Sequence, residues 1–154
     1  MDMNGKIIVD PSTYITGEYK KYNGVAQYSS YLYTIKEGMC VVQKNLNNKQ
    51  NAFGAFDTSG NLIIPIEYQE LRNFTNGFSL AKKDNKYGII NKKNEVVVPF
   101  TYDTVYYIHE GKSIFVKKGK FGCISVNGTE LFPAIYDMAD DYANGYAVVI
   151  KDKK

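Results

Sequence analysis

The sequence contains one histidine, His109. A histidine-based metal site or a Ser/His/Asp relay would have to be built on this residue, because imidazole is the usual general base near neutral pH. His109 lies in the polar segment YYIHEGK, just before a glycine. A solvated loop histidine is therefore expected, and the sequence predicts neither a metal site nor a catalytic relay here.

The two cysteines, Cys40 and Cys123, cannot form a structural zinc site alone, because such sites need four ligands and the spacing matches no zinc finger. Two buried, reduced thiols are the favoured interpretation, and a disulfide is the alternative. No GxGxxG motif and no P-loop occur in the sequence. The chain is accordingly expected to need no cofactor.

Two pairs of acidic residues could in principle act as general acid and base, Asp140 with Asp141 and Glu67 with Glu70. The chain contains a 34-residue repeat, described below, and these acidic residues do not recur in it: the residue equivalent to Asp140 in an earlier unit is Arg72. Solvated loop carboxylates are expected instead. The sequence therefore predicts no catalytic residue, and an enzyme is the least favoured class of function.

The composition favours a folded, weakly charged protein. Hydrophobic residues make up 44% of the chain and charged residues 23%, with a net charge of +3, so a packed core is expected and disorder is not. Of the 19 basic residues only Arg72 is an arginine. Since arginine is the preferred side chain for contacts with phosphate and bases, nucleic acid is not expected as a partner.

The N-terminal segment MDMNGKIIVDPSTY has an acidic residue at position 2 and no long apolar run, so it does not resemble a signal peptide. No stretch approaches the roughly 18 apolar residues of a membrane span. A cytoplasmic protein without a membrane partner is the resulting expectation.

Four columns of residues recur every 34 positions, the step from 53 to 87 and from 87 to 121. They are an aromatic-glycine pair, a proline, a tyrosine and a second glycine. The members are Phe53-Gly54, Tyr87-Gly88 and Phe121-Gly122; Pro65, Pro99 and Pro133; Tyr68, Tyr102 and Tyr136; and Gly77, Gly111 and Gly145. Four columns with one period indicate an internal structural repeat.

The first third of the chain is a degenerate copy of this repeat. NGKIIVDPSTY resembles SGNLIIPIEY, and EGMCVVQK resembles NGFSLAKK, with a tyrosine-rich insertion within 14–33 between the two pieces. The predicted organisation is a single β-repeat domain, 1–154. It comprises a degenerate unit 1–52 and regular units 53–86, 87–120 and 121–154.

Helical hairpins can also have a 34-residue period, but each unit here carries a mid-segment proline, several glycines and β-branched clusters such as VVV at 96–98. Within a unit, YGIIN, VVV and KSIFVKK are predicted as three short strands. A unit this thin cannot bury its own apolar face, so neighbours must stack. The predicted fold is all-β, an open propeller-like or β-solenoid array of three to four stacked units.

The repeated columns are expected to be structural. The aromatic ring should fill the interface between units, while glycine lets the backbone pass close beside it. Proline should end the returning strand, because it cannot donate to a ladder. The tyrosine of Pro-x-x-Tyr should span the core and form a hydrogen bond at its rim.

The pattern of KYGII, a turn, VVVPFTYD, a glycine and an apolar strand ending in lysine resembles the WG (KWG) repeat family of bacterial β-repeat proteins. The resemblance covers residues 53–154 well and 1–52 poorly. Phe53, Tyr87 and Phe121 stand where the family has tryptophan, and Gln69 replaces the aspartate that ends the motif elsewhere. The resemblance implies a binding or scaffold role without shared catalytic residues, and some small members are encoded beside secreted toxins.

Recognition is expected in the residues that vary over this constant frame. Loops 67–76, 101–110 and 135–144 are rich in tyrosine, which is favoured in binding surfaces. The candidate partner-binding residues are Phe74, Tyr106, Tyr107, His109, Asp140, Asp141 and Tyr142. An alternative for each ring is a place in the core.

Two functions remain open beside an enzyme. The first is a non-catalytic protein-binding module, which the resemblance extends to a cytoplasmic immunity protein that neutralises a toxin domain. Its net charge of +3 is unusual for an inhibitor of basic nucleases. The alternative is a glycan- or peptide-binding repeat protein that uses tyrosine rings as stacking platforms.

Overall fold

The computed structural model describes residues 21–22, 25–26, 35–46, 50–140 and 142–152. All regular elements in these residues are β-strands, as the sequence predicts. They are β1 (Lys21–Tyr22), β2 (Val25–Ala26), β3 (Ile35–Lys36), β4 (Met39–Leu46), β5 (Gln50–Asp57), β6 (Leu62–Tyr68), β7 (Glu70–Leu71), β8 (Phe78–Lys83), β9 (Lys86–Asn91), β10 (Val96–Tyr102), β11 (Thr104–Val105), β12 (Lys112–Lys117), β13 (Lys120–Ser125), β14 (Glu130–Tyr136), β15 (Met138–Ala139) and β16 (Val149–Ile150).

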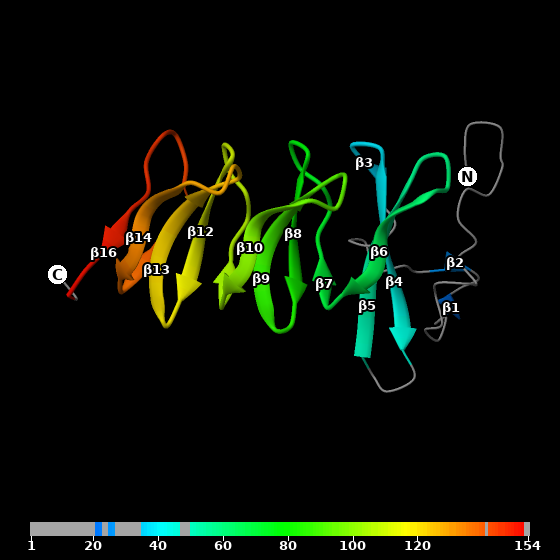
Figure 1. Cartoon of the computed structure of the whole chain (residues 1–154), viewed down its shortest axis with the longest axis horizontal. Helices are drawn as coiled ribbons and strands as arrows, with labels where there is room; N and C mark the ends of the chain where they lie inside the picture. The colour runs from blue at the N-terminus through cyan, green and yellow to red at the C-terminus, as the bar shows by residue number, and fades with distance from the viewer. Residues whose placement is uncertain (1–20, 23–24, 27–34, 47–49, 141, 153–154) are drawn as a thin grey trace.

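Three antiparallel sheets of four strands follow one another along the chain, in the orders β3-β4-β5-β6, β10-β9-β8-β7 and β11-β12-β13-β14. The pairs β1-β2 and β15-β16 form two smaller sheets. Figure 1 shows successive sheets side by side, with β16 and β3 toward opposite ends of the array. The predicted all-β array of stacked units is confirmed, and the array is open rather than closed into a ring.

Each four-stranded sheet crosses the boundary between two sequence units. β8, the last strand of unit 53–86, pairs with β9, the first strand of unit 87–120, over the full length of both strands. β10 then pairs with β9, and the two-residue strand β7 pairs with β8 to complete the sheet. The three expected strands are present in units 53–86 and 87–120, whereas in unit 121–154 the third strand is reduced to the two residues of β16. β7 and its equivalents are too short to show any periodicity in the sequence. Neighbouring units are therefore joined by ladder hydrogen bonds as well as by stacking.

The expectation that proline ends the returning strand was wrong. Pro65 and Pro99 lie inside β6 and β10, which are edge strands of their sheets. An edge strand leaves one row of N–H groups without a ladder partner, so a residue that lacks this group is tolerated there. The register between β9 and β10 also shifts between Val98 and Tyr102. The proline thus belongs to an irregular stretch within the edge strand.

The glycine after the aromatic residue is required by a close backbone approach, as expected. A Cβ atom added to Gly54 or Gly88 would lie 2.6 Å from the carbonyl oxygen of Ile64 or Val98, respectively. At Gly122 the added atom would lie 2.4 Å from the Phe115 ring. Real Cβ atoms do not approach other atoms so closely, so a larger residue would push the neighbouring strand or ring away.

Two clusters of buried side chains occupy the spaces between successive sheets. The first joins β4, β5 and β6 to the following sheet and includes Ile64, Tyr68, Phe74 and Ile90. The second joins the β7–β10 sheet to β11, β12 and β13, and Phe115 lies at its centre with 0% exposure. The β7–β10 sheet is therefore covered on both faces, which explains its nearly continuous apolar strands.

The aromatic column lies at the margin of these clusters rather than at their centres. Phe53 and Tyr87 are half-buried and pack against the first and second cluster, respectively. The Tyr87 hydroxyl donates to Glu70 Oε1 at 2.8 Å, and burial raises the pKa of Tyr87 to about 12, helped by that carboxylate. Phe121 stacks on Tyr106 with ring centroids 6.3 Å apart. The predicted interface role thus holds only in part.

The tyrosine of Pro-x-x-Tyr takes its predicted position most clearly in the first regular unit. Tyr68 is 2% exposed, and its hydroxyl donates to Asn94 Oδ1 at 2.7 Å. Asn94 lies in the turn between β9 and β10 of the next sheet. The ring therefore spans the first cluster and ends in a hydrogen bond to the neighbouring unit, which satisfies its polar atom.

The residue that follows the tyrosine of Pro-x-x-Tyr holds a nearby hairpin turn in place, as Asp103 does for the turn between β12 and β13. Asp103 pairs with Lys86, and its Oδ2 accepts a hydrogen bond from Lys118 N at 2.7 Å. The hydrogen bond from Lys86 and the backbone bond lower the pKa of Asp103. In the preceding unit Gln69 makes a similar contact one position further along the turn, since its Oε1 accepts from Asn85 N at 2.7 Å. The substitution of glutamine for aspartate therefore preserves the turn contact.

Candidate functional site

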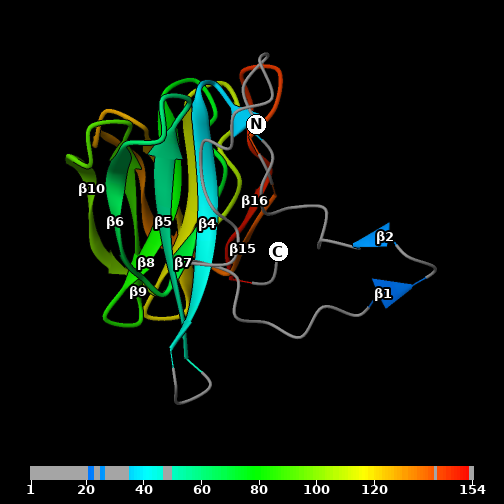
Figure 2. The ribbon, with the colours of Figure 1, turned by 90° about the vertical axis from the view of Figure 1, so that its right-hand side faces the viewer.

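Two loops leave one lateral edge of the array, one after β7 and one after β11. This edge lies opposite the one formed by β6, β10 and β14, and Figure 2 shows β6 and β10 along that other edge. Arg72 N–H donates to Leu80 O, and Tyr106 N–H donates to Ile114 O, both at 2.9 Å. Each loop is thus attached to a strand whose own side chains are in the core.

A pair of buried serines ties the same loops down more firmly. Ser79 Oγ donates to Arg72 O at 2.5 Å, and Ser113 Oγ donates to Tyr106 O at 2.8 Å. Both serines are 1% exposed, so each hydrogen bond satisfies a group that would be costly to bury alone. The pair was not among the predicted columns, although the serines are separated by the repeat length, from 79 to 113.

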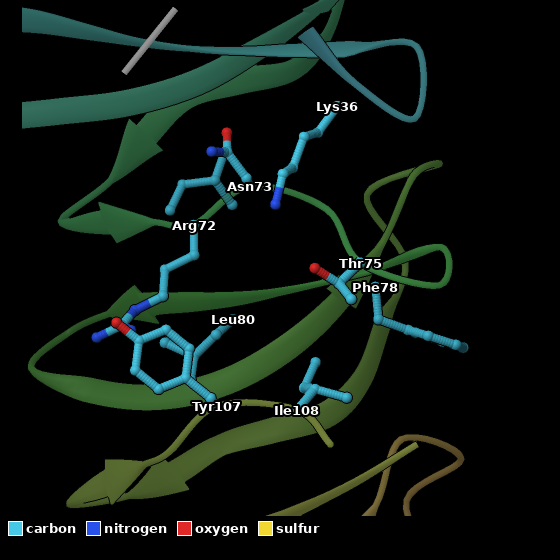
Figure 3. Close-up of a pocket in the computed structure, with 9 residues that line it drawn as sticks. Lys36, Arg72, Asn73, Thr75, Phe78, Leu80, Tyr107 and Ile108 are labelled. Carbon is cyan, nitrogen blue, oxygen red and sulfur yellow. The ribbon is translucent and has the colours of Figure 1, made fainter. Parts of the chain in front are cut away.

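Between β3 and these two loops lies a hollow of about 460 Å³ (Figure 3). Its volume falls in the range of small-ligand sites, roughly 300–1,000 Å³. Three separate segments of the chain contribute its walls. The lining residues are Lys36, Leu71, Arg72, Asn73, Thr75, Phe78, Leu80, Tyr107 and Ile108.

The charged side chains of the hollow are both cations. The Arg72 guanidinium lies over the Tyr107 ring, 4.5 Å from its centroid, and this contact orients the arginine. Figure 3 shows the Lys36 side chain entering the hollow from the β3 side. No carboxylate is among the described residues that line the hollow, and neither cation takes part in the ion pairs that join described residues. The polar side of the hollow is therefore positive.

Beside Asn73 and Thr75, four apolar side chains form the rest of the wall. Leu71 and Leu80 are 4% and 3% exposed, which places most of each side chain in the core. Phe78 and Ile108 are half-buried and pack against the second cluster. An apolar floor beside two cations strengthens electrostatic interactions, because it displaces water from the charged groups. The arrangement can hold an anion that carries an apolar body.

The equivalent place one repeat later is built differently. Lys112 stands where Phe78 stands in the first hollow, and Tyr142 stands where Ile108 does. The Lys112 ammonium lies 4.4 Å from the centroid of the Tyr142 ring. The Tyr142 hydroxyl donates to Gly145 O at 2.7 Å, which holds the ring across the lysine. The Tyr142 ring therefore covers the Lys112 ammonium, which would otherwise face a ligand at this place.

Three of the predicted partner-binding residues lie in the loop after β11. Tyr107 is 60% exposed and lines the hollow, whereas Tyr106 is 39% exposed and stacks on Phe121. His109 is exposed at the start of the following turn, where its backbone pairs with Lys112. The structure brings Tyr107 and Arg72 together and places His109 outside the lining of the hollow.

The other predicted residues are dispersed. Phe74 is 1% exposed and belongs to the first cluster, so it is withdrawn from the candidate surface and takes the core alternative. Asp140 is exposed, and Tyr142 is half-buried over Lys112. Asp141 lies outside the described residues.

Two residues of the hollow, Arg72 and Lys36, were not among the predicted site residues. Arg72 was noted only because it is the sole arginine, although a unique side chain in a variable loop is itself a signal of a special position. Lys36 precedes the turn of the β3–β4 hairpin and lies in the degenerate unit, far from the loop of Tyr107 in sequence. The stacking of the three four-stranded sheets brings them together, and no local pattern in the sequence encodes that proximity.

Neither thiol shows features of a reactive or metal-binding group. Cys40 and Cys123 are free, with Cys123 buried and Cys40 half-buried, and burial raises the pKa of both thiols. Among the described residues, no three His, Cys, Asp or Glu side chains lie close enough to hold a metal ion. The search for an apolar helix that could cross a membrane, limited to the same part of the chain, found none.

Comparison with known proteins identifies the repeats. A family model described as WG containing repeat matches residues 53–87, 87–121 and 121–154. These three matches cover most of the chain and follow the 34-residue period of the conserved columns. No curated protein and no solved structure matches the chain.

Proposed function

We propose that this chain, which belongs to the family of WG containing repeats, is a non-catalytic protein-binding module. The observation that supports the proposal most strongly is the exposed, aromatic loop edge held on a rigid frame. Tyr107 is 60% exposed although it is anchored beside Arg72, and Tyr106 is 39% exposed although it stacks on Phe121. Rings that are exposed and held in place lose little conformational freedom when a partner binds.

The composition of this edge also favours a protein partner. Tyrosine and arginine are enriched among the residues that contribute most to protein–protein binding. Arg72, Tyr106 and Tyr107 occur in neighbouring loops whose backbones are pinned by buried serines. The edge therefore offers a small, preformed set of anchors, which suits recognition without turnover of the partner.

A finer proposal concerns the identity of the partner. Resemblance to small proteins encoded beside secreted toxins suggests a cytoplasmic immunity protein that blocks a toxin domain. The net charge of +3 favours a toxin domain that presents an acidic surface to this protein, because like charges would oppose association.

Co-expression with candidate toxin domains tests the proposal. Growth of cells that produce the cognate toxin should be restored by the parent protein, and less so by the double variant Tyr106→Ala with Tyr107→Ala. A matched control is Val96→Ala, because Val96 is 55% exposed on β10 at the opposite edge. Melting temperatures of both variants should stay close to that of the parent, since the changed side chains are exposed.

The proposal fails if no direct binding accompanies any rescue, or if the double variant binds and protects as well as the parent. Equal loss in Val96→Ala would place the interface at the other edge.

A second candidate function is peptide or glycan binding, and the hollow beside Tyr107 is the observation that favours it. A glycan would use ring faces and neutral hydrogen-bonding groups, whereas this hollow combines apolar walls with two cations. Peptide binding is therefore the stronger form of this alternative. Binding to a glycan array that is abolished by Tyr107→Ala would favour the glycan form instead.

A further inference from the structure

We infer that the hollow between β3 and the loops after β7 and β11 binds a carboxylate carried on an apolar body, presented by a peptide segment of the partner. The inference rests on the proposed function and names the group that the partner contributes. The carboxylate would meet Arg72 and Lys36, and the apolar body would cover the floor that includes Leu80.

Charge is the first argument for this ligand. Arg72 and Lys36 approach the hollow from different segments, and none of the lining residues in the described part of the chain is acidic. No ion pair between described residues joins either cation to a carboxylate, so an anion that enters the hollow could form charge-assisted contacts with both. An arginine fork binds a carboxylate through two parallel N–H···O bonds, and the Tyr107 ring 4.5 Å away holds that fork in place.

The apolar lining is the second argument. Leu71, Leu80, Phe78 and Ile108 are four of the nine lining residues, and all four are buried or half-buried. A phosphate group alone would leave this surface without a partner, whereas a leucine- or phenylalanine-sized body would cover it. A volume of about 460 Å³ accommodates one or two residues of a peptide.

The chain itself provides a comparison within one molecule. At the equivalent position one repeat later, the Tyr142 ring covers the Lys112 ammonium. In the first hollow Ile108 replaces that tyrosine and Phe78 replaces that lysine, so the ring and its cation are both absent. The ligand is inferred to occupy the room that an aromatic ring takes in the next repeat.

Titration of the ¹⁵N-labelled full chain with three short peptides tests the inference by NMR. The probes are acetyl-Phe-Leu with a free C-terminal carboxylate, acetyl-Phe-Leu-amide, and acetyl-Phe-Glu-Leu-amide with an internal carboxylate. At least one carboxylate-bearing probe should shift the amide signals of residues 71–80 and 107–108. The uncharged amide should bind about tenfold more weakly or worse, as expected when a charge-assisted hydrogen bond is lost.

The two charged probes separate the possible sources of the carboxylate. Binding by the first alone indicates recognition of a chain terminus, and binding by the third alone indicates an acidic side chain within a segment. Either result supports the inference. Equal binding of the uncharged peptide, shifts confined to other residues, or no shift with any probe would each overturn it. Tighter binding of phenyl phosphate than of both charged peptides would also overturn it, in favour of a phosphorylated ligand.

Substitutions identify the groups responsible. Arg72→Gln and Lys36→Gln should each lower the affinity for the carboxylate-bearing peptide about tenfold. Lys93→Gln is the matched control, because Lys93 is an exposed turn residue that loses the same charge outside the lining. Tyr107→Ala should also lower the affinity for this peptide, because the Arg72 guanidinium would lose the ring that orients it. Unchanged affinity in both Arg72→Gln and Lys36→Gln would overturn the inference.

Failure of this inference can be told apart from failure of the proposed function. The peptide titration uses the isolated chain and needs no knowledge of the partner. If the partner binds and Arg72→Gln leaves that binding intact, the hollow is not the contact, although the module still binds protein. If the probes bind and no toxin is neutralised, the immunity proposal alone is lost.

Discussion

Leu80 and Ile114 occupy equivalent positions in successive sheets and are 3% and 2% exposed, whereas Phe78 and Lys112, two residues earlier, differ in both charge and surroundings. Leu80 and Ile114 face the interior of the array, and Phe78 and Lys112 lie where the loops after β7 and β11 end and the next strands begin. Equivalent residues of successive units are therefore similar in the core and different at the edge that carries the loops.

The reason for this difference is the density of contacts on each side. A buried position is surrounded by neighbouring sheets, so a change in volume creates a cavity or a clash. At the loop edge, the backbone is held by Ser79 and Ser113, and the side chains are free of that constraint. Variation can then alter recognition without altering the frame.

The strongest test of this comparison pairs one residue from each region. Phe115→Ala should lower the free energy of unfolding by about 3–5 kcal/mol, because the ring is fully buried in the second cluster. Tyr107→Ala should change it by about 0.5 kcal/mol or less, as is usual for exposed side chains. Urea unfolding followed by circular dichroism measures both. Similar losses in the two variants would break the comparison.

A second test concerns close backbone approach inside the array. Gly88→Ala should destabilise the protein by about 1–3 kcal/mol, because the new Cβ would lie 2.6 Å from Val98 O and displace β10. Gly119→Ala is the control: its added Cβ meets nothing within 4 Å, so its cost comes from the positive φ of 73°.

Hydrogen exchange separates the two glycine variants. In Gly88→Ala the amides of β9 and β10 should exchange faster, whereas Gly119→Ala should affect only the turn between β12 and β13. Unchanged protection of β10 in Gly88→Ala would contradict the proposed reason for the glycine column.

The smallest expected effect lies at the turns, where sheets meet outside the core. The Glu37 carboxylate accepts hydrogen bonds from Asn76 N at 2.5 Å and Gly77 N at 2.9 Å, and Lys92 lies 3.1 Å from it. The hydrogen bond from Gly77, with smaller contributions from Lys92 and Asn76, lowers the pKa of Glu37 below 4.5. Since the pKa is lower in the folded state, this contact stabilises the protein above pH 4.5 and is lost as pH falls below that value.

Glu37→Gln should therefore lower the melting temperature by about 1–3 °C at pH 7. The difference from the parent should shrink as the pH falls below 4.5. Thermal unfolding at pH 7 and at a series of acidic values measures it. A difference that stays constant with pH would show that the carboxylate charge does not contribute.

Much of the frame could be predicted from sequence because it repeats. The spacing of Gly54 and Gly88 correctly indicated a close backbone approach, and Tyr68 spans the core as expected. The role of proline was mistaken, since sequence shows that Pro99 lacks a donor but not that its strand lies at a sheet edge. The burial of Phe74 was left open, because a ring in a variable loop can face either way.

The amino-acid sequence by itself determined the all-β class, the length of the unit and the residues that must be small or apolar. These properties follow from local geometry and from a period that needs no knowledge of distant contacts. The tertiary structure decided which strand of one unit pairs with the next, and it brought Lys36, Arg72 and Tyr107 around one hollow. Those residues belong to three different segments, and their proximity arises only when the sheets stack to bury their shared faces.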